Sequence, residues 1–242
     1  SLESKTGDRA GHRNGVMVRD LAAFDKLRDL HGESDVKWRS GVKHDCAEVM
    51  EFRKTPNGLM NGLGEMVNIE PACLFPLLKG SDLANGRIAS ATRFVLITQK
   101  FIGESTDIIQ KTAPKTWAYL EAHAKHLEGR KSRIYRNRPR FSIFGVGAYT
   151  FAPWKIAICG LYKTLQFRLV GQIEDKPVIF DDTIYFLSFV DEIHARKIYQ
   201  LLLSPPATKF LSSLIFWDEK RPIKAGILNH LDLRRLEGLA LN

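Results

Sequence analysis

The side chains best suited to binding a charged partner form one cluster between Gly129 and Gly147. About half of the positions from 130 to 140 are cationic, and no Asp or Glu lies among them. Guanidinium groups make bidentate hydrogen bonds to phosphate and to guanine edges, so the excess of Arg over Lys favours nucleic acid as the partner. The alternative is a solvated loop whose charge is balanced elsewhere on the surface. The cations of this basic run are Arg130, Lys131, Arg133, Arg136, Arg138 and Arg140.

Other residues could extend such a binding surface. Ser132 and Tyr135 add neutral donors within the basic run, of the kind that position a DNA backbone. Tyr149 follows the run and, like Tyr135, could pack on sugars or bases. Trp38 and Arg39 lie near Lys43 and suggest a second basic and aromatic patch. Five further candidate cations lie outside the basic run. Each one alone is typical of a solvated surface, but several on one face would form a positively charged cleft. The cations in question are Lys43, Lys155, Lys163, Lys220 and Arg221.

The segment that follows the basic run carries two glycines, Gly145 and Gly147, in the sequence FGVG. A loop of this kind binds S-adenosylmethionine in methyltransferases when it joins a strand to a helix. Here AYTFAPWK follows, which is strand-like, and no carboxylate stands at the end of the next strand. The interpretation preferred is therefore a bulge or a close approach between strands, which glycine permits. We expect no cofactor to bind to this chain.

The sequence lacks the signatures of two kinds of enzyme that act on DNA. The tetrapeptide NPPY or DPPY, which accepts the amine hydrogens in adenine-N6 methylation, is absent. A metal-dependent nuclease would need an Asp followed by a Glu-x-Lys or Asp-x-Lys motif. The segments Glu174–Lys176 and Asp181–Asp182 occur in the wrong order for this, and a turn and a strand-end cap explain them as well. We expect no catalytic residue and no metal ligand in this chain, with a divergent stand-alone methyltransferase or a nuclease as the alternative.

Composition sets further bounds. The chain has 242 residues and a net charge of +9, which makes a polyanion the first partner to consider. Its three cysteines are widely spaced and show no metal-ligand or paired spacing, which is typical of a reduced, cytoplasmic protein. No apolar run reaches the length of a membrane span. The polar residues 1–15 predict a flexible segment, and the chain could be a fragment of a longer protein.

The order of apolar patterns predicts the fold class. Helical spacing occurs over 16–30, and RFVLITQ at 93–99 is typical of a buried strand. A helix is expected from Thr112 to Gly129, and another over 191–203, with Pro205 ending it and a further short helix at 207–216. Between 141 and 190, strands are predicted to follow one another without helices. FSIFGVGAYTF is expected to be one of them, and LQFRLVGQ and KPVIFDD are expected to be neighbouring strands. This order predicts an α+β protein with a central mixed, largely antiparallel sheet flanked by helices, forming one domain over 16–242.

Several segments, read in order, resemble one known family. WRSGVKHDCAEVME, FPLLKGSDLANG, RFVLITQK, the RKSRIY stretch, FSIFGVGAYTFAPWKIAICGLYK, PVIFDDTIYFL and KRPIKAGILNHLDL are similar to the C-terminal region of Eco57I/TaqI-like adenine-N6 DNA methyltransferases of bacterial type II restriction–modification systems. The resemblance covers about Val36 to Leu233. It implies a target-recognition domain that grips double-stranded DNA, while a catalytic domain in the same or another chain binds S-adenosylmethionine and methylates the flipped adenine.

Overall fold

The computed structural model describes residues 10–240, and within this range most strands belong to two sheets. The larger sheet has six strands in the order β11-β7-β8-β4-β5-β6, all antiparallel except for the parallel pair β11 and β7. The smaller sheet has the order β10-β9-β12-β3 and is antiparallel throughout. The strands of the larger sheet are β4 (Glu51–Thr55), β5 (Gly58–Asn61), β6 (Met66–Val67), β7 (Leu74–Leu78), β8 (Arg93–Leu96) and β11 (Ile179–Phe180).

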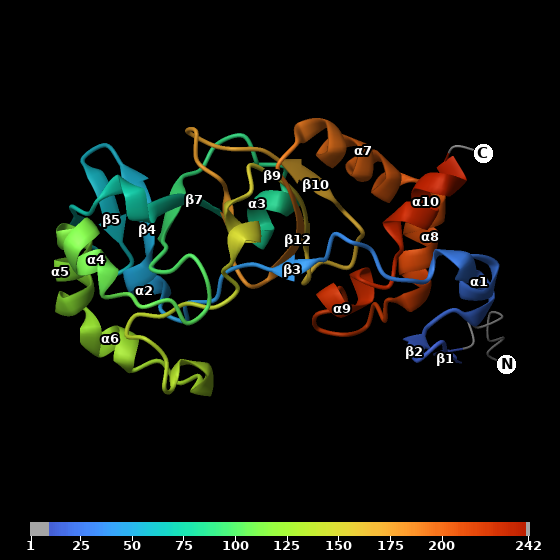
Figure 1. Ribbon diagram of the computed structural model, residues 1–242, viewed down its shortest axis with the longest axis horizontal. Helices are drawn as coiled ribbons and strands as arrows, with labels where there is room; N and C mark the ends of the chain where they lie inside the picture. The colour runs from blue at the N-terminus through green and yellow to red at the C-terminus, as the bar shows by residue number, and fades with distance from the viewer. Residues whose placement is uncertain (1–9, 241–242) are drawn as a thin grey trace, which may run out of the picture.

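Helices cover the larger sheet at one end of the molecule (Figure 1). Within α5, the buried residues Thr116 and Leu120 are one turn apart, so one stripe of the helix faces the core. Pro114 occupies the first turn of α5, where its missing N–H costs no hydrogen bond. The predicted strand at 93–99 is confirmed over Arg93–Leu96, whereas the single helix predicted from Thr112 to Gly129 is two helices, α5 and α6. The helices are α2 (Ala47–Met50), α4 (Ile108–Thr112), α5 (Pro114–Ala122) and α6 (Ala124–Glu128).

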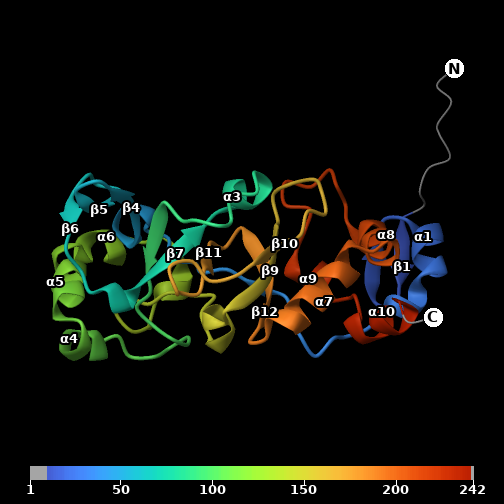
Figure 2. The same cartoon turned by 90° about the horizontal axis from the view of Figure 1, so that it is seen from above.

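The smaller sheet packs against helices from both ends of the described chain. Phe24 of α1 contacts Phe210 of α8 with ring centroids 5.7 Å apart, and the backbone N–H of Asp232 donates to the carbonyl of Leu30. Figures 1 and 2 show α1 and α10 at the same end of an elongated molecule. The elements here are β1 (Gly11–Arg13), β2 (Val16–Val18), α1 (Leu21–Lys26), β3 (Arg39–Ser40), β9 (Trp154–Cys159), β10 (Arg168–Val170), β12 (Ile184–Phe189), α7 (Glu192–Leu203), α8 (Pro205–Leu214), α9 (Ala225–Leu228) and α10 (Leu233–Ala240).

A third apolar cluster joins the two sheets. Leu78 of β7 and Phe180 of β11 share it with Ala157 of β9 and Phe186 of β12. Helix α3 (Gly80–Ala84) supplies Leu83 to the same cluster. The chain therefore passes between the sheets with continuous apolar packing. The α+β class and the mixed, largely antiparallel pairing are confirmed, with the strands divided between two sheets. The interpretation of 16–242 as one domain stays a prediction.

The N-terminal expectations need correction where the structure describes them. Residues 1–9 lie outside the described range, but Gly11–Arg13 pairs with Val16–Val18 in a hairpin. The turn is Asn14-Gly15, both with positive φ (49° and 78°), the pattern of a type I′ hairpin turn. The helix predicted from residue 16 therefore begins only at Leu21, where the Asp20 carboxylate accepts the N–H of Ala23 at 2.9 Å.

Two predictions in the middle of the chain are also wrong. The stretch 141–151 is not a strand: Phe144 makes one isolated bridge with Lys43, and 148–151 form a 3-10 helix. The segments LQFRLVGQ and KPVIFDD are not neighbouring strands, because β10 pairs with β9 while β11 pairs with β7. The turn between them has positive φ at Glu174 and Asp175, and it redirects the chain from one sheet to the other.

Candidate nucleic-acid interface

The basic run leaves the end of α6 and has only one short 3-10 helix, Arg133–Tyr135, as regular structure. Arg130 anchors it. Its Nε donates to the carbonyl of Leu127 at 2.6 Å, and its Nη1 donates to the carbonyls of Ser142 at 2.7 Å and His44 at 3.1 Å. Burial lowers the pKa of this guanidinium. Arg130 thus ties two distant segments together and is half-buried, and its predicted contact with DNA stays a prediction.

Tyr135 completes this anchor. The guanidinium of Arg130 lies 3.6 Å from the centroid of its ring, and the hydroxyl donates to the carbonyl of Lys43 at 3.3 Å. The ring also meets Phe144 edge-on, with centroids 5.5 Å apart. Burial raises the pKa of the Tyr135 hydroxyl. The predicted stacking of Tyr135 on sugars or on bases therefore competes with the packing of its ring inside the protein.

Replacing Arg130 with Met should destabilise the fold. The change leaves three backbone carbonyls without their donor in a half-buried position, so we expect the free energy of unfolding to fall by about 2–4 kcal/mol. Urea denaturation measures this. Arg133→Met is the matched control, because Arg133 is exposed and makes no ion pair within residues 10–240; a change of about 0.5 kcal/mol or less is expected there. Equal losses in both variants would contradict the anchoring role.

Arg140, at the far end of the run, is neutralised. Its Nε lies 2.9 Å from the carboxylate of Glu128, and its Nη1 pairs with Glu121. The hydrogen bond that Arg140 donates to the Glu128 carboxylate is the main reason that the pKa of Arg140 is raised. The absence of acidic residues within the run had predicted six free cations. The carboxylates instead come from α5 and α6, so Arg140 is corrected from a free cation to a paired one.

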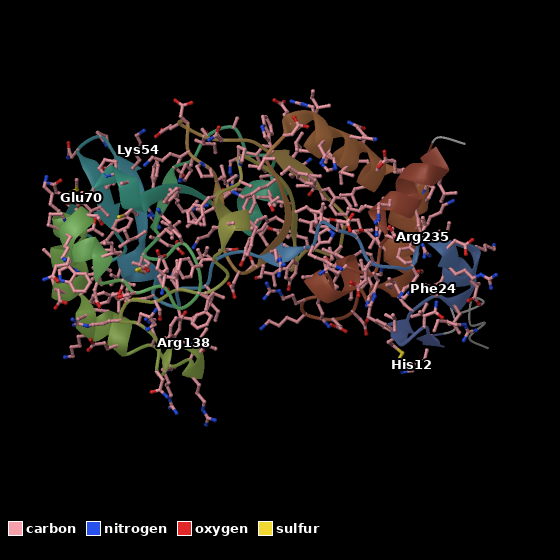
Figure 3. The ribbon with its side chains drawn as sticks, in the orientation of Figure 1. His12, Phe24, Lys54, Glu70, Arg138 and Arg235 are labelled. Atoms are coloured by element: carbon pink, nitrogen blue, oxygen red, sulfur yellow. The ribbon has the colours of Figure 1, made fainter. Side chains whose placement is uncertain are left out.

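The rest of the run is exposed. Lys131, Arg133 and Arg136 form no ion pair with any residue that the structure describes, and the guanidinium of Arg138 lies only over the Phe144 ring, at 5.8 Å. Ser132 is half-buried between them. Figure 3 labels Arg138 where this segment projects from the body of the molecule. The run borders a hollow of about 530 Å³, lined also by Leu127 and Pro139. Four cations are therefore available to an anionic partner.

Lys155 was expected on the surface and is buried. It is 1% exposed as the second residue of β9, and its Nζ donates to the carbonyl of Val178 at 2.6 Å. Rings of Phe180 and Phe186 surround the amine, with centroids 6.0 and 5.7 Å away. Burial lowers the pKa of Lys155 to about 7. Both faces of β9 are covered, so this lysine cannot reach DNA.

The other predicted contacts differ in accessibility. Lys43 lies 2.6 Å from Asp45 and 3.8 Å from Asp182, so its charge is largely balanced. Arg221 donates to the Asp182 carbonyl and lies over the Tyr185 ring, which ties it to the protein. Lys163 and Lys220 are exposed. These four cations come from three separate segments, since Lys220 and Arg221 are neighbours in the sequence. They do not join the basic run in one continuous cluster of unpaired cations.

Of the basic and aromatic patch predicted around β3, one residue is buried and one is exposed. Trp38 belongs to the apolar core and is 4% exposed. Arg39 is exposed, and its guanidinium lies 5.4 Å from the centroid of the half-buried Tyr149 ring. Tyr149 also contacts Phe186 from β12, at 6.0 Å. Arg39 is thus an accessible cation held by Tyr149, while Tyr149 presents little of its ring to a partner.

Gly145 permits a close backbone approach, as predicted. Gly145 has φ of +69°, and a Cβ there would lie 2.3 Å from the carbonyl oxygen of Gly41. The segments that contain Gly41 and Gly145 touch through their backbones at this point. After FGVG, residues Ala148–Phe151 form a 3-10 helix, and the N–H of Gly147 before it donates to the Thr150 hydroxyl at 3.1 Å.

The carboxylates considered for metal chemistry have other partners. Glu174 lies 2.8 Å from Lys54, and the Asp181 carboxylate accepts the Thr183 N–H at 3.1 Å and its hydroxyl. Burial raises the pKa of Asp181. In the part of the chain that the structure describes, no group of three or more His, Cys, Asp or Glu side chains is placed to hold a metal ion. None of the described helices is long and apolar enough to cross a membrane.

Comparison with known proteins adds one close relative. No family model matches the sequence. The chain is 57% identical over 242 residues to the type II methyltransferase M.NspV of Nostoc sp. (strain ATCC 29411 / PCC 7524). This identity makes the chain a homologue of one part of M.NspV. The alignment covers 100% of this chain and 50% of M.NspV, so the chain spans half the length of this relative.

Among solved structures, the chain is similar to the type IIL restriction–modification enzyme MmeI in complex with DNA. The match has a TM-score of 0.43 and 11% sequence identity, and it covers 73% of this chain and 22% of MmeI. The relation to a type II methyltransferase therefore depends on M.NspV alone.

Proposed function

We propose that this chain recognises double-stranded DNA as the specificity part of a bacterial type II adenine-N6 DNA methyltransferase. Support comes from the 57% identity to M.NspV across the whole chain and from the ordered segments that resemble a target-recognition region. The catalytic domain, in the same or another chain, would bind S-adenosylmethionine and carry the NPPY-type motif that these 242 residues lack. The reaction would take place in the cytoplasm, where the DNA is.

One observation carries the proposal: four exposed cations on a projecting segment, of which Lys131, Arg133 and Arg136 have no ion pair within residues 10–240. Cations that the protein does not neutralise gain most from releasing the counterions of a phosphate backbone. Arg130 and Tyr135 hold the base of the segment, so its charges are displayed from a fixed support. Phosphate contacts of this type set the position and register of a protein on the duplex.

A methyltransferase acting on adenine must extrude that base from the duplex. In the proposed division of labour, this chain holds the DNA on either side of the target while the catalytic domain receives the base. Arg side chains are suited to both tasks of recognition, since one guanidinium can bridge phosphate oxygens or the O6 and N7 atoms of guanine. Arg133, Arg136 and Arg138 are the candidates for this role, and Lys131 for a phosphate contact.

Fluorescence anisotropy with a random-sequence duplex at several salt concentrations tests the proposal. If four cations meet phosphates, the slope of log K against log salt should be about −3.6 or steeper. Arg136→Gln should make that slope shallower by about one. Binding that is weak at low salt and insensitive to salt would contradict the proposal. If the parent chain binds with the expected slope, selection from a random pool of duplexes identifies its preferred site.

A further inference from the structure

The turn that follows β8 displays two large apolar side chains to solvent. Phe101 is 57% exposed and Ile102 is 46% exposed. The backbone N–H of Glu104 donates to the carbonyl of Phe101 at 3.2 Å, which closes a four-residue turn. Gly103 has φ of +87°, as the third residue of a type II turn requires. The apolar pair therefore stands at the tip of a defined turn.

The base of this turn is fixed in the core. Thr98 and Gln99 are 4% and 2% exposed. The hydroxyl of Thr98 donates to the carbonyl of Phe141 at 2.8 Å, and the side-chain oxygen of Gln99 accepts the N–H of Ile143 at 2.9 Å. The side-chain amide of Gln99 also donates to the carbonyl of Glu104. These hydrogen bonds hold the two ends of the turn together and attach its base to the core.

The same hydrogen bonds place the turn beside the basic run. Phe141 and Ile143 directly follow Arg140, and Thr106 donates to the carbonyl of Arg140. Figure 1 shows the two segments in the lower part of the molecule. Lys100, next to Phe101, is exposed and has no ion pair within the described chain, while the neighbouring Glu104 carboxylate accepts the backbone N–H of Lys100. The apolar tip thus has one exposed cation, Lys100, next to it, and its base contacts the end of the basic run at the carbonyl of Arg140.

We propose that Phe101 and Ile102 form a wedge that inserts between base pairs of bound duplex DNA. This deepens the proposed function and depends on it. Proteins that deform DNA use apolar side chains of this kind to separate stacked bases. The cations of the basic run and Lys100 would hold the phosphates on either side of the opened step. Partial opening of the stack next to a target base lowers the cost of extruding that base. Sequence reasoning missed the pair, although KFIGE, a Lys and two large apolar residues before a turn glycine, is a readable signal.

The test compares two random-sequence duplexes of about 30 base pairs, one intact and one with a single-nucleotide bulge at its centre. A bulge opens a step in advance, so a wedge binds it more tightly whatever the surrounding sequence. Anisotropy titrations should show a preference of roughly tenfold or more for the bulged duplex in the parent chain. Phe101→Ser combined with Ile102→Ser should remove the preference and leave the salt dependence unchanged. Val190→Ser combined with Ile193→Ser is the matched control, because these residues are 86% and 79% exposed near α7.

The outcomes separate the wedge from the proposed function. A preference that is lost in the Phe101 and Ile102 variant and kept in the control, with both variants folded by circular dichroism, supports the wedge. A parent that binds both duplexes equally, or a preference that survives in the variant, overturns the wedge while DNA binding stands; the turn is then a contact for another protein. A parent that binds neither duplex overturns the wedge and the proposed function together.

Discussion

Removing the four exposed cations of the basic run together should abolish most of the salt-dependent affinity for DNA. In the variant with Gln at Lys131, Arg133, Arg136 and Arg138, the slope of log K against log salt should be shallower by about 3.6 than in the parent. The fall in affinity between 50 and 200 mM salt should then shrink by roughly 100-fold. The stability should hardly change, because none of the four makes an ion pair within residues 10–240.

The control keeps the net charge of this variant and moves the substitutions. Gln at Lys26, Arg28, Lys209 and Arg234 also removes four exposed cations, but these lie on or near α1, α8 and α10, remote in the fold from the basic run. If both variants lose the same affinity, the chain attracts DNA only through its overall charge of +9, and the basic run has no special role. Salt titrations of both variants by anisotropy decide between these results.

Replacing the buried Lys155 with Met should change how stability depends on pH. Burial lowers the pKa of Lys155 to about 7 in the folded chain, against an ordinary value near 10.4 in the unfolded chain. Between these values the unfolded chain binds more protons, so this lysine makes the parent more stable as pH rises, by up to about 1.4 kcal/mol per pH unit. Below pH 7 the full cost of burying the charge is present. Lys155→Met removes this contribution to the pH dependence.

The variant should therefore exceed the parent in stability near neutral pH, and this advantage should shrink as pH rises toward 10. The upper bound on the change is roughly 4–5 kcal/mol, and the Val178 carbonyl left without its donor offsets about 1–3 kcal/mol of the gain. The difference between variant and parent is the quantity to measure, by urea denaturation across this range, because the buried thiols of Cys46 and Cys159, whose pKa values burial raises, titrate in both proteins.

Lys163→Met provides the comparison for Lys155, since Lys163 is exposed and its loss should leave the pH dependence unchanged. A difference between Lys155→Met and the parent that stays constant from neutral to alkaline pH would show that the amine does not change protonation on folding. In that case the ion would be retained in the core by the Val178 carbonyl and by the rings of Phe180 and Phe186.

Local sequence determined the elements whose signals are short-range. The apolar run at 93–96 gave a buried strand, Pro114 began a helix, and the Asp191 carboxylate caps α7 where the pattern changes from strand to helix. Strands that follow one another without helices predicted the α+β class. The Asn14-Gly15 hairpin was equally readable, because that dipeptide favours the turn it forms. These features depend on residues close together in the chain.

Tertiary structure decided which cations are free to act. Arg140 is balanced by Glu121 and Glu128, which lie 19 and 12 residues before it, and Arg130 is held by the carbonyl of His44, 86 residues away. Lys155 is buried because both faces of β9 are covered, a fact that the alternation within WKIAIC does not contain. The sequence sets how many cations the basic run contains. Which of them stay unpaired depends on carboxylates and carbonyls that only the folded chain brings near, because charge pairing and burial act through space.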